Sequence, residues 1–110
     1  MVGNDLTIGD QTIQGDGALG RNIIDIINSA DGLIDGNVAG ETLVIDAGSG
    51  GLTNAGTVQA SGGGQTTIND TVVDNAGGTI VAQDGSTVLL NSSTIDGGSV
   101  SSVGLSLIHI

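Results

Sequence analysis

The chain of 110 residues contains no cysteine, no proline and no aromatic residue. Without cysteine it can form neither a disulfide framework nor a thiolate metal site. Aromatic side chains usually supply a large share of the area buried in a globular core, and that source is missing here. These absences argue against an ordinary globular domain and favour a narrow core of stacked aliphatic side chains.

Positive charge is nearly absent as well. A single basic residue, Arg21, stands against twelve acids, so the formal net charge is −11. Such a charge repels nucleic-acid phosphates and anionic membrane surfaces. No apolar run approaches the roughly 20 residues of a membrane-spanning helix, and the first residues lack the pattern of a signal peptide. We therefore expect no nucleic-acid partner and no direct membrane insertion, and any export signal would have to lie outside this sequence.

What the sequence does contain is glycine together with β-branched aliphatic residues. There are 21 glycines, yet 37% of the chain is hydrophobic and the mean hydropathy is positive, at +0.29. A chain that could not bury apolar surface would be disordered, but this one is apolar enough to fold. Val, Ile and Thr favour extended structure. The composition predicts an ordered, all-β fold.

A repeat of about 22 residues organises the second half of the chain. The phrase NAGTVQASGGGQTTINDTVVD at 54–74 aligns with NAGGTIVAQDGSTVLLNSSTID at 75–96, which has one extra glycine. An earlier segment, GLIDGNVAGETLVID, supplies equivalent apolar positions with a slip of one or two residues. Self-similarity at this period is typical of solenoids, in which each repeat stacks on the next.

Aligning the repeats places apolar residues in columns, and within each repeat they alternate with polar ones, as in short strands. DG, GG and NAG turn signals separate the runs. Three strands and three turns make one rung of a parallel β-helix, which at this rung length we expect to be right-handed, with four to five rungs stacked about 4.8 Å apart. The predicted core residues are Ile34, Val58 and Ile80, with Val100 in the same column; Ile45, Ile68 and Leu90; Leu52, Val73 and Ile95; and Val88.

The first part of the chain is less regular. Residues 6–8, 12–14 and 23–27 are predicted to be strands. The phrase GDGALG at 15–20 matches a dinucleotide-binding fingerprint, but a chain this rich in glycine produces such matches by chance, so we interpret it as a loop. We expect Arg21 to form a surface ion pair with Asp16 or Asp25.

Asp46, Asn69 and Asn91 form a polar column at the ends of predicted strands. Asn and Asp tolerate left-handed backbone and can hydrogen-bond along a stack. We interpret the column as an internal ladder that satisfies turn amides, the alternative being a row of ligands.

The repeated phrases LTNAGTVQASGGG, NAGGTIVAQDGSTVLLNSSTIDGG and INSADGLIDG resemble the parallel β-helices of filamentous-haemagglutinin-like adhesins and autotransporter passenger domains, over about residues 6–103. The resemblance implies an extracellular or bacterial cell-surface protein. It also implies a structural or adhesive role, in which the scaffold presents its surface to a host or matrix receptor or glycan during cell attachment.

The two ends of the sequence prompt two further expectations. We expect residues 1–104 to be an incomplete, uncapped β-helix segment, whose unpaired strand edges would associate end to end with other copies. The last six residues, LSLIHI, carry no turn signal and hold the single histidine. They resemble a translated sequencing adapter, so residues 105–110 are predicted to be a non-native tail, the alternative being a strand of the next rung.

Catalysis is not expected. Enzymes built on parallel β-helices combine clustered acids with Arg, Lys or His, and this chain has one Arg and one His. No organic cofactor is implied. Calcium is the more serious candidate, because carboxylate and amide oxygens at glycine-rich turns are ligands of the right kind. The weak candidates are Asp74, Asp84 and Asp96, so the alternative function is a calcium- or glycan-binding β-solenoid module.

Overall fold

The computed structural model describes residues 5–109, which form fifteen strands and no helix. Sheet A consists of β1 (Asp5–Ile8), β4 (Asp25–Asn28), β7 (Leu52–Asn54), β10 (Val72–Asp74) and β13 (Thr94–Asp96). Sheet B consists of β2 (Thr12–Gln14), β5 (Leu33–Gly36), β8 (Thr57–Ala60), β11 (Thr79–Ala82) and β14 (Ser99–Ser102). Sheet C consists of β3 (Gly17–Leu19), β6 (Thr42–Ile45), β9 (Gln65–Asn69), β12 (Thr87–Asn91) and β15 (Leu107–His109).

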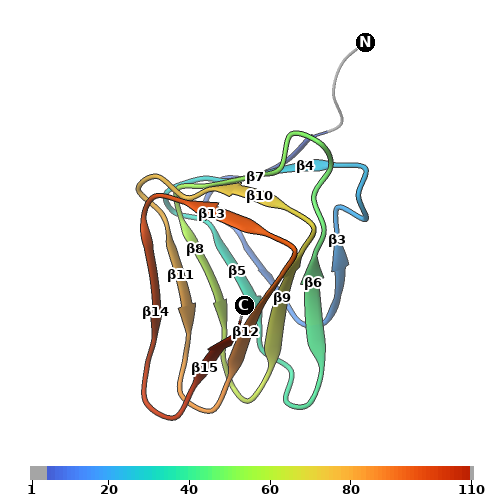
Figure 1. Cartoon of the computed structure of the whole chain (residues 1–110). Helices are drawn as coiled ribbons and strands as arrows, with labels where there is room; N and C mark the ends of the chain where they lie inside the picture. The colour runs from blue at the N-terminus through green and yellow to red at the C-terminus, as the bar shows by residue number, and fades with distance from the viewer. Residues whose placement is uncertain (1–4, 110) are drawn as a thin grey trace.

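The three sheets enclose one coil of five rungs, each with one strand from every sheet (Figure 1). Neighbouring strands within a sheet are parallel, as in the pairing of β8 with β11. From the C-terminal end, the chain passes from β13 through β14 to β15 counterclockwise as the rungs advance toward the viewer, so the coil is right-handed (Figure 1). The predicted fold class, an all-β parallel solenoid, is confirmed.

The pairing register reproduces the predicted columns. Val58 pairs with Ile80, which lies 22 residues later (80 − 58). The second rung is longer, because Ile34 pairs with Val58 across 24 residues (58 − 34) and Ile26 pairs with Leu52 across 26 (52 − 26). Part of this excess lies in the link between β6 and β7, which has six residues, whereas the link between β9 and β10 has two. Extra residues at a corner leave the strand register unchanged, so the repeat tolerates them.

The interior is a narrow column of aliphatic side chains. Apart from Ile95 and Val100, all the predicted core residues are buried, and Ile95 is partly buried and packs against this core. Its exposure follows from its place in the fifth rung, beyond which the described chain has no further strand to cover it. Val100, in the same rung, is 42% exposed for the same reason. A fully buried Ile, Leu or Val contributes about 1.5–3 kcal/mol relative to an exposed one, and the stacked columns therefore supply most of the driving force for folding.

Two local predictions for the first rungs are wrong. Residues 17–19, expected to belong to a loop, form β3, because Leu19 pairs with Ile45 in sheet C and long-range pairing outweighs the local glycine signal. The strand predicted over 23–27 begins only at Asp25. Ile23 lies in a turn and is 69% exposed, because the chain has to turn from sheet C into sheet A before the next strand can start.

The segment after residue 104 continues the solenoid. β15 pairs in parallel with β12, which places Ile108 beside Val88, and Ile108 packs against the core. The predicted boundary at residue 104 therefore does not mark the end of the strand stacking, because Ile108 provides an apolar residue at the inward position. The non-native origin of residues 105–110 stays a prediction about the reading frame, to be tested by resequencing the DNA beyond the codon for Gly104. Residues 1–4 and 110, which belong to the two predicted segments, lie outside the described residues.

Candidate functional site

A buried ladder of asparagines runs along the corner between sheets A and B. Asn28, Asn54 and Asn75 are 1%, 0% and 0% exposed. Asn28 Nδ2 donates a hydrogen bond to Asn54 Oδ1 at 2.8 Å, and Asn54 Nδ2 donates to Asn75 Oδ1, also at 2.8 Å. Each amide donates again to a backbone carbonyl; the acceptors include Thr57 O at 3.1 Å, Thr79 O at 3.3 Å and Gly97 O at 3.1 Å. The ladder satisfies polar groups that the corner would otherwise leave buried without partners.

Glycines make room for this ladder. A Cβ atom built on Gly78 would collide with the carbonyl oxygen of Asn54, and one on Gly56 would collide with the carbonyl oxygen of Ser29. Only a residue without a side chain fits where the backbone of one rung passes this close to the next. The phrase NAG, which recurs at 54 and 75, is the sequence signal of the ladder, although by itself it predicts only a turn.

The ladder has an unsatisfied end in the second rung. Asn28 Oδ1 is buried and has no hydrogen-bond partner among the described residues. The residue opposite Asn28 in the first rung is Ile8, which cannot donate a hydrogen bond. The ladder therefore stops one rung before the N-terminal end of the stack, and Ile8 covers it with an apolar side chain.

The ladder predicted from the sequence lies at a different corner and is shorter. Asn91 Nδ2 donates to Asn69 Oδ1 at 2.9 Å in an exposed position at the ends of β9 and β12. Asp46 follows β6 but is not joined to Asn69 by any side-chain hydrogen bond among the described residues, and its buried Oδ1 has no partner. The structure thus joins Asn69 to Asn91 by a hydrogen bond, whereas Asp46, which follows the paired residue Ile45, takes no part in the ladder.

The three weak calcium candidates are not brought together. Asp74 and Asp96 occupy paired positions in sheet A and are both exposed. Asp84 lies at another corner, between sheets B and C, where its Oδ1 accepts a hydrogen bond from the Leu105 amide at 2.7 Å. No group of three or more His, Cys, Asp or Glu side chains able to hold a metal ion is found within residues 5–109.

One carboxylate is buried on the outer face of sheet B. Asp35 is 6% exposed and accepts hydrogen bonds from Ser61 Oγ at 2.8 Å and from Gln59 Nε2 at 3.0 Å. Gln83 Nε2 donates in turn to Gln59 Oε1 at 3.1 Å. These partners come from the third and fourth rungs, so the chain of bonds ties neighbouring rungs together and occupies the carboxylate oxygens.

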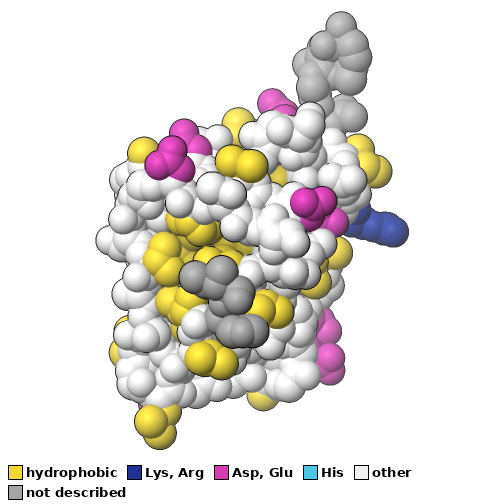
Figure 2. Space-filling view, viewed as in Figure 1, with side chains coloured by type: hydrophobic (Ala, Val, Ile, Leu, Met, Phe, Trp, Pro, Cys, Tyr) yellow, Lys and Arg dark blue, Asp and Glu magenta, His cyan; other side chains and the backbone are white. Residues whose placement is uncertain are grey.

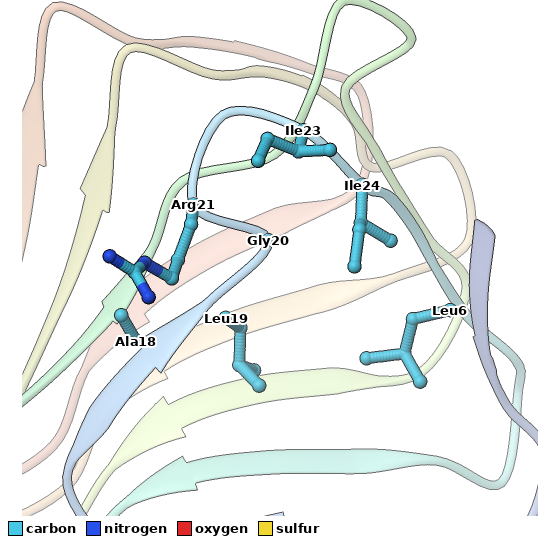
Figure 3. A pocket seen from close by; sticks show the side chains of 7 residues that line it. All are labelled: Leu6, Ala18, Leu19, Gly20, Arg21, Ile23 and Ile24. Atoms are coloured by element: carbon cyan, nitrogen blue, oxygen red, sulfur yellow. The ribbon is translucent and has the colours of Figure 1, made fainter. Parts of the chain in front are cut away.

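A hollow of about 330 Å³ opens at the N-terminal end of the stack (Figure 3). Leu6, Leu19 and Ile24 line its apolar wall. Its other lining residues are Ala18, Gly20, Arg21 and Ile23. The volume is at the lower end of the range for ligand pockets, and such a wall can accommodate an apolar group.

Arg21 lies at the rim of this hollow and extends past Ala18 (Figure 3). Among the described residues no ion pair joins it to Asp16 or Asp25, so the expected pairing is not found. The Asp25 carboxylate instead accepts a hydrogen bond from the Gly50 amide at 2.9 Å. Arg21 and Asn22 both have left-handed backbone, with φ values of 48° and 61°, and this tight turn directs the guanidinium outward.

The described residues contain no helix that is long and apolar enough to cross a membrane. Comparison of the chain with protein-family models, with curated proteins and with solved structures finds no match in any of the three. The parallel β-solenoid is therefore the part of the resemblance to adhesin β-helices that stands on structural evidence.

Proposed function

We propose that the chain is a rigid structural segment of a secreted or bacterial cell-surface protein. In this role its outer faces attach to a host or matrix receptor or to a glycan, and it performs no catalysis. The observation that carries the proposal is the continuous interior, in which three parallel sheets stack their aliphatic columns through five rungs. Such a coil is stiff along its axis and offers three long outer faces, as a presenting scaffold requires.

The side chains on these faces support the proposal. The outer face of sheet B carries a row of Thr57, Thr79 and Ser99 in register. Hydroxyl and amide groups at regular spacing are suited to polar contacts with a receptor or a glycan. Catalysis would require convergent acids and bases, and the single basic residue of the chain stands exposed at the N-terminal end. The resemblance of the repeated phrases to adhesin β-helices points the same way.

A binding panel tests the adhesive part of the proposal. The purified chain would be immobilised and probed with collagen, fibronectin, laminin and a glycan array. We expect at least one reproducible signal, which the surface variant Thr57→Lys/Thr79→Lys weakens although its circular dichroism is unchanged. A matched double variant on another outer face, Thr53→Lys/Val72→Lys, should retain the signal if sheet B is the presenting face. No signal with any probe would contradict attachment.

A calcium-binding module is the second candidate function. The observation that favours it is the pairing of Asp74 with Asp96, which places two exposed carboxylates side by side on sheet A. Like charges opposite one another destabilise a sheet, and a divalent cation would relieve that repulsion. Titration of the chain with calcium chloride in a calorimeter tests this candidate, and the absence of heat would remove it.

A further inference from the structure

The two end rungs have free strand edges. Within the described chain, β1, β2 and β3 pair only with the second rung, and β13, β14 and β15 pair only with the fourth. The N–H and C=O groups on the outer edges of these strands point along the stack axis and have no strand partner within residues 5–109. Such edges are templates for pairing with another chain.

The apolar columns also extend to both ends. Ile95, Val100 and Ile108 face inward in the last rung, and none of them is fully buried. In Figure 2, hydrophobic side chains gather on the face toward the viewer, where this rung lies. At the opposite end, the first rung presents Leu6 and Leu19, both partly buried, at the hollow described above.

We propose that a second copy of this chain stacks head to tail on the first, with its β1, β2 and β3 continuing the sheets that end in β13, β14 and β15. This assembly goes beyond the scaffold function and does not depend on attachment to a receptor. A head-to-tail contact of this kind does not close on itself, so it would extend into a filament as more copies add.

The register of the new contact follows from the columns. Leu6, Ile26, Leu52, Val73 and Ile95 occupy one column of sheet A, so Leu6 of the next copy would lie on Ile95. By the same reasoning in sheet B, Ile13 would lie on Val100. In sheet C, Gly17 would face Ile108. The apolar columns of sheets A and B would therefore continue, and in sheet C the bulky Ile108 would meet a residue without a side chain.

The charges in this register are compatible. Asp96 would lie against Thr7, and Asp5 against Thr94, so neither acid would face another acid. Contact between two C-terminal ends would make the strands antiparallel, and the columns could not continue in register. Each copy carries a formal charge of −11, so long-range repulsion between copies opposes assembly. Added salt screens this repulsion and should therefore favour assembly.

Cysteine cross-linking tests the register directly, because the chain has no cysteine of its own. In the head-to-tail register Ser99 of one copy lies beside Thr12 of the next, and both positions are exposed. Adjacent strands lie close enough for a disulfide bond at such a site. Mixing Thr12→Cys with Ser99→Cys under mild oxidation should give a cross-linked heterodimer, in yields well above those of either variant alone.

A matched control separates specific stacking from random collision. Val72 is 64% exposed on a side face of the fourth rung, so Val72→Cys mixed with Ser99→Cys measures the background yield. A yield for the Thr12→Cys and Ser99→Cys mixture no higher than this background would overturn the proposal. Efficient dimerisation of Ser99→Cys alone would also overturn it, because it would indicate contact between two C-terminal ends.

Sedimentation velocity gives an independent measurement. The unmodified chain should form species larger than a monomer, increasingly so with concentration and salt. Val100→Lys should abolish them by placing a charge on the end face, whereas Val72→Lys, the same replacement on a side face, should not. A chain that stays monomeric at every concentration and salt level would refute the assembly while leaving receptor binding, measured on the immobilised chain, untouched.

Discussion

Asn54 donates its side-chain Nδ2 to Oδ1 of Asn75 at 2.8 Å, and this bond joins the third rung to the fourth inside the corner between sheets A and B. Asn54 Oδ1 accepts a bond from Asn28 at the same time. One side chain thus connects three successive rungs at a position that is 0% exposed. The Asn54 side chain therefore stabilises the polar corner of the stack, as the aliphatic columns stabilise its apolar interior.

Replacing Asn54 with leucine should destabilise the fold strongly. The change leaves Asn75 Oδ1 buried without its donor and removes the acceptor of Asn28 Nδ2, and a buried unsatisfied group costs about 1–3 kcal/mol. We expect the free energy of unfolding to fall by about 2–4 kcal/mol, measured by urea denaturation followed by circular dichroism. Asn91→Leu, which breaks the exposed bond to Asn69, is the control and should cost much less. Equal losses in the two variants would show that burial of the ladder is unimportant.

The aliphatic columns should contribute more in the middle of the stack than at its end. Ile68→Ala removes a side chain that is 0% exposed, and we expect a loss of about 2–5 kcal/mol from the cavity it leaves. The same replacement at Ile95, which is partly buried in the last rung, should cost less than half as much. Ile68→Asp should unfold the middle rungs. Similar melting temperatures for Ile68→Ala and Ile95→Ala would argue against stability built from neighbouring rungs.

Two adjacent glycines should respond differently to alanine. Gly77 has a φ of 76° with open space where a Cβ would lie, so Gly77→Ala should cost only the left-handed backbone penalty of about 1–2 kcal/mol. A Cβ on Gly78 would collide with the Asn54 carbonyl, and Gly78→Ala should cost about 3 kcal/mol or more because backbone has to move. Chemical denaturation of both variants measures the difference. A larger loss at Gly77 would contradict the close approach of the two rungs.

The stacked acids on sheet A provide a test that also bears on calcium. Asp96→Asn removes the repulsion between Asp74 and Asp96, so the free energy of unfolding should rise by up to about 1 kcal/mol at low salt. The gain should shrink as salt is added, because both side chains are exposed. If calcium raises the melting temperature of the unmodified chain and not that of Asp96→Asn, the calcium-binding candidate is favoured over the scaffold without a metal.

The candidate site was harder to predict from the sequence than the fold. Asn69 and Asn91 were expected to form a ladder, and they do share a hydrogen bond, but the bond is exposed. The buried ladder uses Asn54 and Asn75, which follow the same kind of strand and carry the same kind of side chain. Sequence alone does not distinguish the two corners, because at both of them the asparagines stand at the end of a short strand or directly after it. The direction of the side chain, inward or outward, depends on how the backbone turns.

The sequence by itself determined the rung, the three apolar columns and the all-β class, since a period of about 22 with alternating aliphatic residues can bury its side chains only by stacking on copies of itself. The tertiary structure decided what local pattern leaves open. It made a strand of Gly17–Leu19 and another of Leu107–His109, and it separated Asp84 from Asp74 and Asp96. These outcomes depend on contacts between residues about 20 or more positions apart, whose pairing free energy outweighs the preference of any short segment.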